Sequence, residues 1–142
     1  LRNISILFNI LEIALKQKIM NHFNSLYKND YGISPNLNIR IMETFLNACS
    51  LFRNVSAHNE RFYNFTLRRH IAGNRTLVNG QSSNNQKLFT LYSTLKFFLP
   101  KNEYMRLTNS LKNLINELES RLNSISINDI LIRMDFSDDW HK

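Results

Sequence analysis

The sequence predicts an all-α fold, because its composition disfavours strands and its hydrophobic residues follow a helical period. Only three glycines and two prolines occur in 142 residues, whereas a small all-β domain needs many more turn residues. Hydrophobic residues make up 43% of the chain and recur at steps of three and four, as in amphipathic helices. We therefore expect residues 1–142 to form one domain, a bundle of four main helices with a short C-terminal helix.

The first predicted helix covers residues 3–28. Polar residues interrupt its apolar run at helical spacing, and no small-residue cleavage site follows, so we interpret it as an amphipathic helix rather than a signal peptide. Its expected buried stripe consists of Ile6, Leu7, Ile10, Leu11, Ala14, Leu15, Ile19 and Phe23. Gly32 predicts the C-terminal stop, and Ser34 and Pro35 predict the N-cap and first residue of the next helix.

The second predicted helix runs from about residue 35 to residue 60 or somewhat beyond. Its expected buried stripe consists of Ile39, Met42, Phe45, Leu46, Cys49 and Phe52. Gly73, Gly80 and a cluster of serines and asparagines then predict a long loop over residues 71–85. A loop of that length in a compact domain is often functional or mobile.

Two longer helices and a short one complete the predicted bundle. The third helix covers about residues 86–98 and ends before Pro100, and the fourth covers about residues 101–123. The expected inner face of the fourth helix consists of Tyr104, Leu107, Leu111, Leu114, Ile115, Leu118 and Leu122. Ser126 predicts the cap of a short last helix, followed by a solvated tail in which Trp140 acts as a docking anchor.

The charge of the chain favours polyanionic partners. The formal net charge is +7 and the sequence pI is about 9.8, so nucleic acid or an acidic membrane face would be attracted to it. No uncharged apolar stretch reaches the ~18 residues of a transmembrane helix. Cys49 is the only cysteine, so no internal disulfide and no cysteine-based zinc site is expected, which fits a reducing cytoplasm. The four histidines are scattered, and we expect no metal or other cofactor.

The segment "LFRNVSAHNERFYNF", residues 51–65, concentrates polar chemistry on a helix with an apolar side. Asn54, His58 and Arg61 follow the i, i+4, i+7 spacing of one helix face, and the long side chain of Arg53 can reach the same space. Such a set suits RNA cleavage: an imidazole transfers protons near neutral pH, and a guanidinium holds the scissile phosphate. By spacing alone, a packing or surface histidine is the commoner explanation.

A resemblance to a known family makes this segment more specific. "RNVSAH", Arg53 to His58, fits the R-N-x-x-x-H motif of the HEPN superfamily. "FRNVSAHNERFYN" resembles a segment of the bacterial abortive-infection (Abi, AbiD/AbiF-like) proteins, which are related to the HEPN domains of RNA-cleaving, RNA-guided CRISPR effectors. "INDILIRMDFSDDWHK" resembles the family's terminal segment, with Met134, Phe136 and Trp140 in register. Asp135 stands where glycine is usual, and Ser137 where proline is usual.

The resemblance implies a HEPN-like helical bundle that acts as a metal-independent endoribonuclease toxin in phage (antiviral) defence. Two copies would form a homodimer whose facing motifs enclose RNA, with Arg53 and His58 catalytic and Asn54 supporting them. This chain would be the C-terminal half of a longer Abi protein, restrained by an antitoxin or a regulatory RNA. Some HEPN proteins only bind RNA or a partner, so a catalytically silent module is the alternative. A membrane-surface protein that uses the first helix is a third, weaker interpretation.

Further residues around the motif are candidates for RNA contacts. Arg61 and Tyr63 match the family's extended segment, and Arg68 and Arg69, with His70, could line the rim of an RNA groove. The alternative for the arginines is a solvated basic helix end. The nearby aromatic residues could stack on bases, although core packing is expected for at least two of Phe62, Tyr63 and Phe65. Core packing or a dimer face is expected for Phe89, Phe97 and Phe98.

Overall fold

The chain folds into helices only, within the part that the computed structural model describes: residues 2–58, 64–72 and 87–141. The helices are α1 (Arg2–Tyr31), α2 (Ile39–Ala57), α4 (Leu88–Leu95), α5 (Lys101–Arg121) and α6 (Ile127–Arg133). The predicted all-α bundle is therefore confirmed. The predicted loop over residues 71–85 falls, beyond Ala72, outside the described residues.

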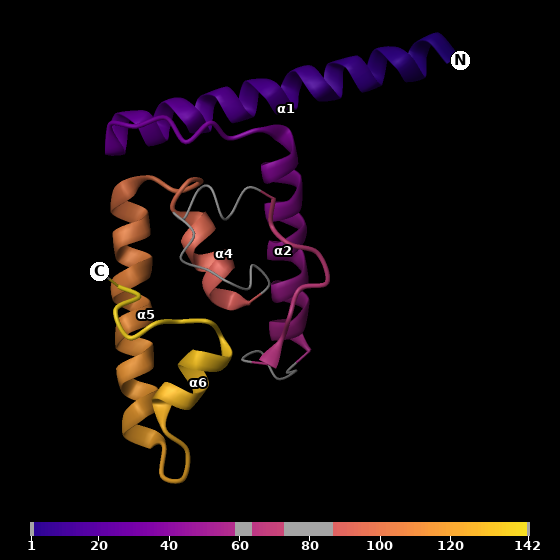
Figure 1. Cartoon of the computed structure of the whole chain (residues 1–142). Coiled ribbons are helices and arrows are strands. Elements are labelled where there is room, and N and C mark those ends of the chain that lie inside the picture. The colour runs from indigo at the N-terminus through magenta and orange to yellow at the C-terminus, as the bar shows by residue number, and fades with distance from the viewer. Residues whose placement is uncertain (1, 59–63, 73–86, 142) are drawn as a thin grey trace.

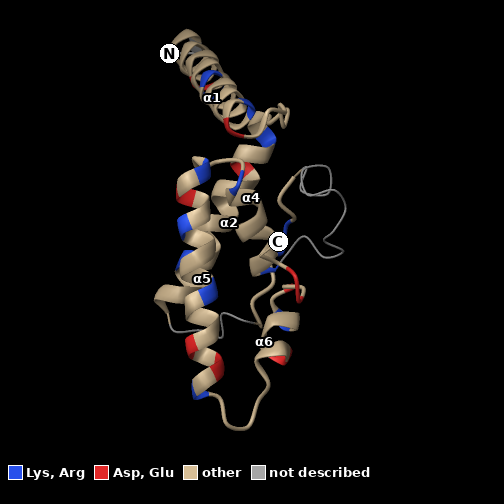
Figure 2. Cartoon of the chain, turned by 90° about the vertical axis from the view of Figure 1, so that its left-hand side faces the viewer, with Lys and Arg blue, Asp and Glu red and all other residues tan. Residues whose placement is uncertain are grey.

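The helices form a short bundle that α1 crosses at one end. Figure 1 shows α2, α4 and α5 beneath α1, with α4 between the other two, and α6 beside α5 at the end away from α1. Figure 2 shows the same arrangement from the side, with basic and acidic residues spread along the length of α5. The N-terminal half of α1 extends beyond the bundle, whereas its C-terminal half lies over it.

The end of α1 is confirmed, but the predicted start of α2 is wrong. Gly32 follows α1 with a φ of +79°, and its N–H donates to the Lys28 carbonyl at 2.8 Å. A left-handed residue after the last turn is the usual place for glycine. Helix α2 begins at Ile39 rather than Pro35, and its N-cap is Asn38, whose side-chain oxygen accepts from the Ile41 N–H at 3.0 Å.

The segment between α1 and α2 stays extended because α1 binds it. The Asn24 side chain accepts from the Leu37 N–H at 2.7 Å and donates to the Leu37 carbonyl at 3.0 Å. Leu37 itself is buried against Met20 and Ile41. These contacts take up the backbone groups that a helix starting at Pro35 would need for itself.

Three apolar clusters make up the core, and each joins segments distant in sequence. The first lies between α1, α2 and the end of α4 and contains Met20, Leu37, Ile41, Met42 and Phe97. The second joins α2 to the segment after the motif and contains Phe45, Ala48, Phe52, Leu67 and Ile71. The third joins α4 to the C-terminal segment and contains Tyr92, Ile127, Leu131 and Phe136.

Several predicted core positions are exposed. On α1 the expected stripe is wrong except at Phe23, which is partly buried: Ile6, Leu7, Ile10, Leu11, Ala14, Leu15 and Ile19 all lie at the surface. The reason is that no described helix lies beside the first half of α1, whereas Met20, with Phe23 and Tyr27, reaches the core from its second half. Leu46, Leu114 and Leu118 are exposed too, because α2 and α5 each pack along one narrow face.

The remaining helices largely match their predicted ranges. Helix α5 covers most of the predicted 101–123, and Ser126 caps α6, accepting from the Asn128 N–H at 3.2 Å. Helix α4 is shorter than the predicted 86–98. Its last residues form tight turns instead, in which Phe97 N–H bonds to Thr94 O at 3.1 Å and Phe98 N–H to Leu95 O at 3.0 Å.

Candidate functional site

The end of α2 presents the motif residues to solvent. Phe52 and Val55 point into the bundle, with 2% and 6% of their surfaces exposed, whereas Arg53 and Asn54 lie at the surface. Successive helix positions are 100° apart, so anchoring Phe52 and Val55 turns the two polar residues outward. The predicted division of this helix into a buried and a polar side is thus observed at its last turns.

His58 marks the end of α2 rather than its middle. The helix was predicted to continue to residue 60 or beyond, but its last residue is Ala57. His58 is the exposed C-cap, with φ −93° and ψ 10°, and its N–H donates to the Asn54 carbonyl at 3.0 Å. The bond keeps His58 one turn beyond Asn54. Arg61, Phe62 and Tyr63 lie outside the described residues.

Arg53, the arginine of the motif, can bind an anion without giving up a described ion pair. Across residues 2–58, 64–72 and 87–141, the ion pairs join Lys16 to Glu12 and Glu43, Arg106 to Glu103, and Arg121 to Glu117. Arg53 takes part in none of them. The C-terminal end of a helix carries a partial negative charge that favours cations nearby. A phosphate can therefore approach Arg53 without displacing a described carboxylate.

Two cations that the sequence interpretation missed converge on Asn64, six residues after His58. Lys87, just before α4, donates from Nζ to the Asn64 carbonyl at 3.3 Å. Arg133, the last residue of α6, donates from Nη1 to Asn64 Oδ1 at 3.4 Å. Both are distant in sequence, at separations of 23 and 69 residues. No local spacing could signal them, because the tertiary fold brings them to this side of the chain.

The residues predicted to line the rim of an RNA groove lie on a segment that is anchored to α2. Arg68, Arg69 and His70 are exposed, between Leu67 and Ile71, which are each 1% exposed. The Thr44 hydroxyl of α2 holds the end of this segment, since it accepts from the Ala72 N–H at 2.9 Å. The three polar side chains thus lie on a stretch fixed at both ends against α2.

Four phenylalanines near the motif and around α4 serve the core. Phe65 meets Phe52 edge to face with ring centroids 5.0 Å apart, which favours packing over base stacking for Phe65. Phe98 stacks on Phe45 at 4.4 Å, and Phe97 stacks on Tyr27 at 4.8 Å. Phe89 packs edge to face on Phe136 at 5.1 Å. The sequence left the roles of these four phenylalanines open. Core packing is therefore observed for Phe65, Phe89, Phe97 and Phe98.

The C-terminal segment is packed rather than fully solvated. Phe136 is buried, and Trp140 lies against both Phe136 and Tyr92 with centroids 5.3 and 5.4 Å apart, as expected of an anchor. The Met134 carbonyl accepts from the Phe89 N–H at 3.1 Å. These contacts fasten the chain end to α4 and so fix Arg133 near Asn64.

Asp135 ends α6 in a conformation that suits glycine. Its φ is +68°, its N–H donates to the Ile132 carbonyl at 3.0 Å, and the Phe136 N–H donates to the Leu131 carbonyl at 2.9 Å. This pair of bonds is a Schellman C-cap, and the accompanying apolar contact is provided by Phe136 and Leu131, which share a cluster. Burial raises the pKa of Asp135, and the positive charge of Lys87 acts in the opposite direction.

The described residues show no arrangement that favours a metal site, a reactive cysteine or a membrane span. Within the described ranges, no group of three or more histidine, cysteine, aspartate and glutamate side chains is placed to hold a metal ion. Cys49 is half-buried on α2, and burial raises the pKa of its thiol. None of the described helices combines the length and the hydropathy needed to cross a membrane.

Comparison with protein-family models, with curated proteins and with solved structures returns no match. Any functional interpretation therefore depends on the residues of the chain itself and on their geometry.

Proposed function

We propose that this chain is a metal-independent endoribonuclease of the HEPN type, which acts in abortive infection and belongs to the Abi-like proteins. The observation that carries the proposal is the exposure of Arg53, Asn54 and His58 together at the end of α2, in the spacing of the R-N-x-x-x-H motif. A histidine and an arginine that serve only to stabilise the fold would be expected to have partners within it.

The proposed chemistry follows from the groups at this site. One His58 imidazole takes the proton of a ribose 2′-hydroxyl, and the 2′-oxygen attacks the adjacent phosphorus. The bond from phosphorus to the 5′-oxygen breaks, and the leaving oxygen takes a proton from the His58 imidazolium of a second copy. Arg53 stabilises the charge on the phosphate oxygens. The products are a 2′,3′-cyclic phosphate and a 5′-hydroxyl, and a 2′-hydroxyl nucleophile makes the reaction selective for RNA.

Two features outside the motif support the family assignment. The glycine of the family's terminal segment corresponds to Asp135, whose left-handed φ of +68° is a conformation in which glycine is favoured. Phe136 and Trp140, the aromatic residues of that segment, pack together in the core. The left-handed backbone at the end of α6 thus accounts for the family's glycine at position 135. The packing of Phe136 on Trp140 accounts for the spacing of the two aromatic residues.

The surrounding charge supports RNA as the ligand. Lys87 and Arg133 meet at Asn64, and Arg68 and Arg69 are exposed on the segment that follows. Basic side chains in such a group contact phosphates without reading sequence. The chain therefore offers cations from three separate segments that follow the motif in sequence.

The decisive experiment is cleavage of single-stranded RNA by the purified protein that carries this chain, with EDTA present. We expect cleavage by the wild type, and a loss of at least ~100-fold in His58→Ala, because general acid–base catalysis is typically worth that much or more. His141→Ala is the matched control, since it also removes an exposed imidazole but lies outside the motif.

Cleavage that survives His58→Ala would sink the proposal. RNA binding without cleavage products by the wild type would instead identify a catalytically silent module. If light scattering shows a monomer that retains full activity, the composite site of two copies is wrong while the motif assignment stands.

A further inference from the structure

The N-terminal half of α1 carries a large apolar surface that no described part of the chain covers. Eight of its apolar side chains are between 50% and 65% exposed: Ile4, Ile6, Leu7, Phe8, Ile10, Leu11, Ile13 and Leu15. The helix runs past the bundle here, so these residues have no described helix beside them (Figure 1). Elsewhere on α1 such residues reach the core, as Met20 does with no exposed surface.

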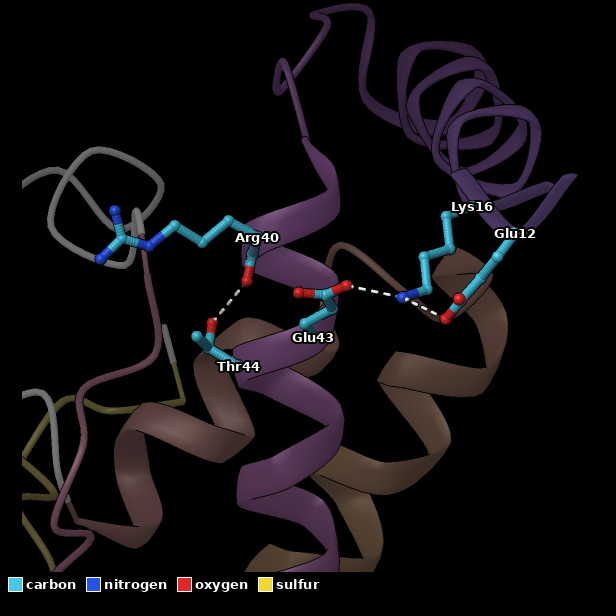
Figure 3. Close-up of polar contacts among 5 residues, drawn as sticks. All are labelled: Glu12, Lys16, Arg40, Glu43 and Thr44. Carbon is cyan, nitrogen blue, oxygen red and sulfur yellow. Dashed lines mark hydrogen bonds and ion pairs between the residues drawn. The ribbon is translucent and has the colours of Figure 1, made fainter. Parts of the chain in front are cut away.

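The orientation of α1 is fixed by polar contacts to α2. Lys16 Nζ lies 2.7 Å from Glu43 Oε1 of α2 and 2.9 Å from Glu12 Oε1, while the Arg40 side chain points away from this cluster (Figure 3). Ser5 and Asn9 share the helix face of Glu12 and Lys16, by the i, i+3, i+4 rule. The face of α1 that continues toward the bundle is therefore polar.

A second face of α1 is apolar. Ile4, Phe8, Leu11 and Leu15 follow one another at steps of three and four residues, which places them on one stripe. Each of them precedes a residue of the polar face, so the stripe lies ~100° around the helix axis from that face. It lies ~130° from the direction of Met20 and Lys16, which are both turned toward the bundle, and it therefore faces away from the described bundle.

The stripe is large for the surface of a monomer. Its four side chains and Ile19, which continues it, are between 44% and 65% exposed. They leave on the order of 500 Å² in water, whereas the largest patch of a typical monomer is ~300–600 Å². Two copies that cover each other's stripe would bury ~1,000 Å² in total, which is the size at which a specific interface begins.

A membrane surface fits this helix less well than a protein does. Helices that lie on membranes carry lysines and arginines along their polar face. Here the polar face offers Ser5, Asn9, Glu12 and Lys16, in which the two charges neutralise each other at 2.9 Å. A lipid headgroup layer would therefore gain little electrostatic attraction from this half of α1.

We propose that the apolar stripe of α1 binds the same stripe of a second copy, with the two helices antiparallel. The register follows from a shallow hollow of about 440 Å³ that continues the stripe and is lined by Leu15, Lys18, Ile19, His22 and Phe23. Phe8, the most exposed apolar residue of α1, fills the hollow of the second copy, and Leu11 lies opposite the second Leu15. The contact is isologous, so both hollows are filled at once.

Charge and shape agree with this register. When Leu11 faces Leu15 of the second copy, Glu12 lies two residues along the axis from the second Lys16, an offset of ~3 Å at 1.5 Å per residue. The flanking stripes therefore meet with opposite charges adjacent. Each bundle lies beneath the C-terminal half of its own α1 (Figure 1), so an antiparallel pair directs the two bundles toward opposite ends.

This contact is distinct from the composite cleft of the proposed function and does not depend on it. Helix α2 leaves α1 near Ile39 and reaches His58 after nineteen residues, ~28 Å farther on. Pairing through α1 therefore leaves the end of α2 free. A protein that used both contacts would assemble beyond the dimer.

The test is the mass of the whole protein in solution, measured by light scattering across the micromolar range. Wild type should be a dimer if α1 alone pairs, and a larger assembly if the motif contact forms as well. Leu11→Glu, which places a charge at the centre of the stripe, should lower that mass by weakening the α1 contact at least ~30-fold, and it should leave any motif contact intact. Asn9→Glu is the matched control: it adds the same charge two residues away on the polar face and should leave the mass unchanged. Far-UV circular dichroism should show equal helicity in all three proteins.

A cross-linking experiment tests the register independently of any folding defect in Leu11→Glu. In a Cys49→Ser background, Phe8→Cys combined with Ile19→Cys should give a covalent dimer under mild oxidation. Within one α1 these positions are ~16 Å apart, too far for a disulfide. A monomeric wild type, a dimer that Leu11→Glu does not weaken, or vesicle binding through the stripe in place of dimerisation would each overturn the proposal.

Discussion

Asp135 occupies a backbone position that glycine would hold at lower free energy. Its φ is +68°, and the two bonds of the C-cap of α6 fix it there. The left-handed conformation costs a residue with a Cβ atom about 1 kcal/mol, taking the low end of the range because aspartate tolerates it better than most. One carboxylate oxygen, Oδ2, is also buried with no hydrogen-bond partner among the described residues, which costs about 1 kcal/mol more.

We therefore expect Asp135→Gly to stabilise the protein at pH 7. Glycine loses more conformational freedom on folding, about 0.5–1 kcal/mol, and this offsets part of the gain. The net increase in the free energy of unfolding is about 1 kcal/mol, which corresponds to a rise in Tm of roughly 2–4 °C for a chain of this size. Urea and thermal unfolding, followed by circular dichroism, measure both quantities.

Two controls separate the contributions at Asp135. Asp135→Ala removes the carboxylate but keeps the Cβ atom. Alanine tolerates the left-handed conformation less well than aspartate, at a cost of about 2 kcal/mol, so after the entropy cost of glycine it should be less stable than Asp135→Gly by about 1 kcal/mol. Burial raises the pKa of the Asp135 carboxyl above 3.8, so folding favours its protonated form. The wild type therefore regains stability as pH falls through the raised pKa, and the advantage of glycine should be smaller near pH 4 than at pH 7. A glycine variant less stable than wild type at pH 7 would refute this reasoning.

Two further predictions concern the support of the motif and its neighbouring cations. Phe52→Ala should lower the free energy of unfolding by about 3–5 kcal/mol, because Phe52 is 2% exposed. Leu46 on the same helix is 53% exposed, so Leu46→Ala should cost far less. Equal losses of the two variants in urea titrations would contradict the observed packing. RNA binding should weaken in both Lys87→Ala and Arg133→Ala, and the slope of log affinity against log salt concentration should fall by about 1 in each. Arg106→Ala on α5 is the control and should change neither quantity. An unchanged slope in fluorescence titrations would show that Lys87 and Arg133 make no phosphate contact.

Helical periodicity was a good guide wherever a helix has neighbours on one side and water on the other. Met42, Phe45 and Phe52 were predicted for the core of α2 and are buried there. The same periodicity was misleading on α1, where an equally clear apolar stripe faces solvent. Period alone says that a face is apolar, but it does not say whether this chain or another molecule covers it.

The limits of the candidate site were also set by the tertiary fold. The sequence predicted Arg53, Asn54 and His58 as a group, and the three lie together at the end of α2. It did not predict that α2 stops at Ala57, because no glycine or proline marks a helix end there. Nor could it place Lys87 and Arg133 beside Asn64, because long-range hydrogen bonds leave no trace in local spacing.

What the sequence determined by itself is the helical class, the Gly32 stop, the start of α5, the Ser126 cap and the motif, since these depend on interactions within a few residues. Tertiary structure alone decided how α1 lies against α2 and which basic residues meet at Asn64. Both depend on contacts between residues far apart in sequence, such as Lys16 with Glu43 and Arg133 with Asn64.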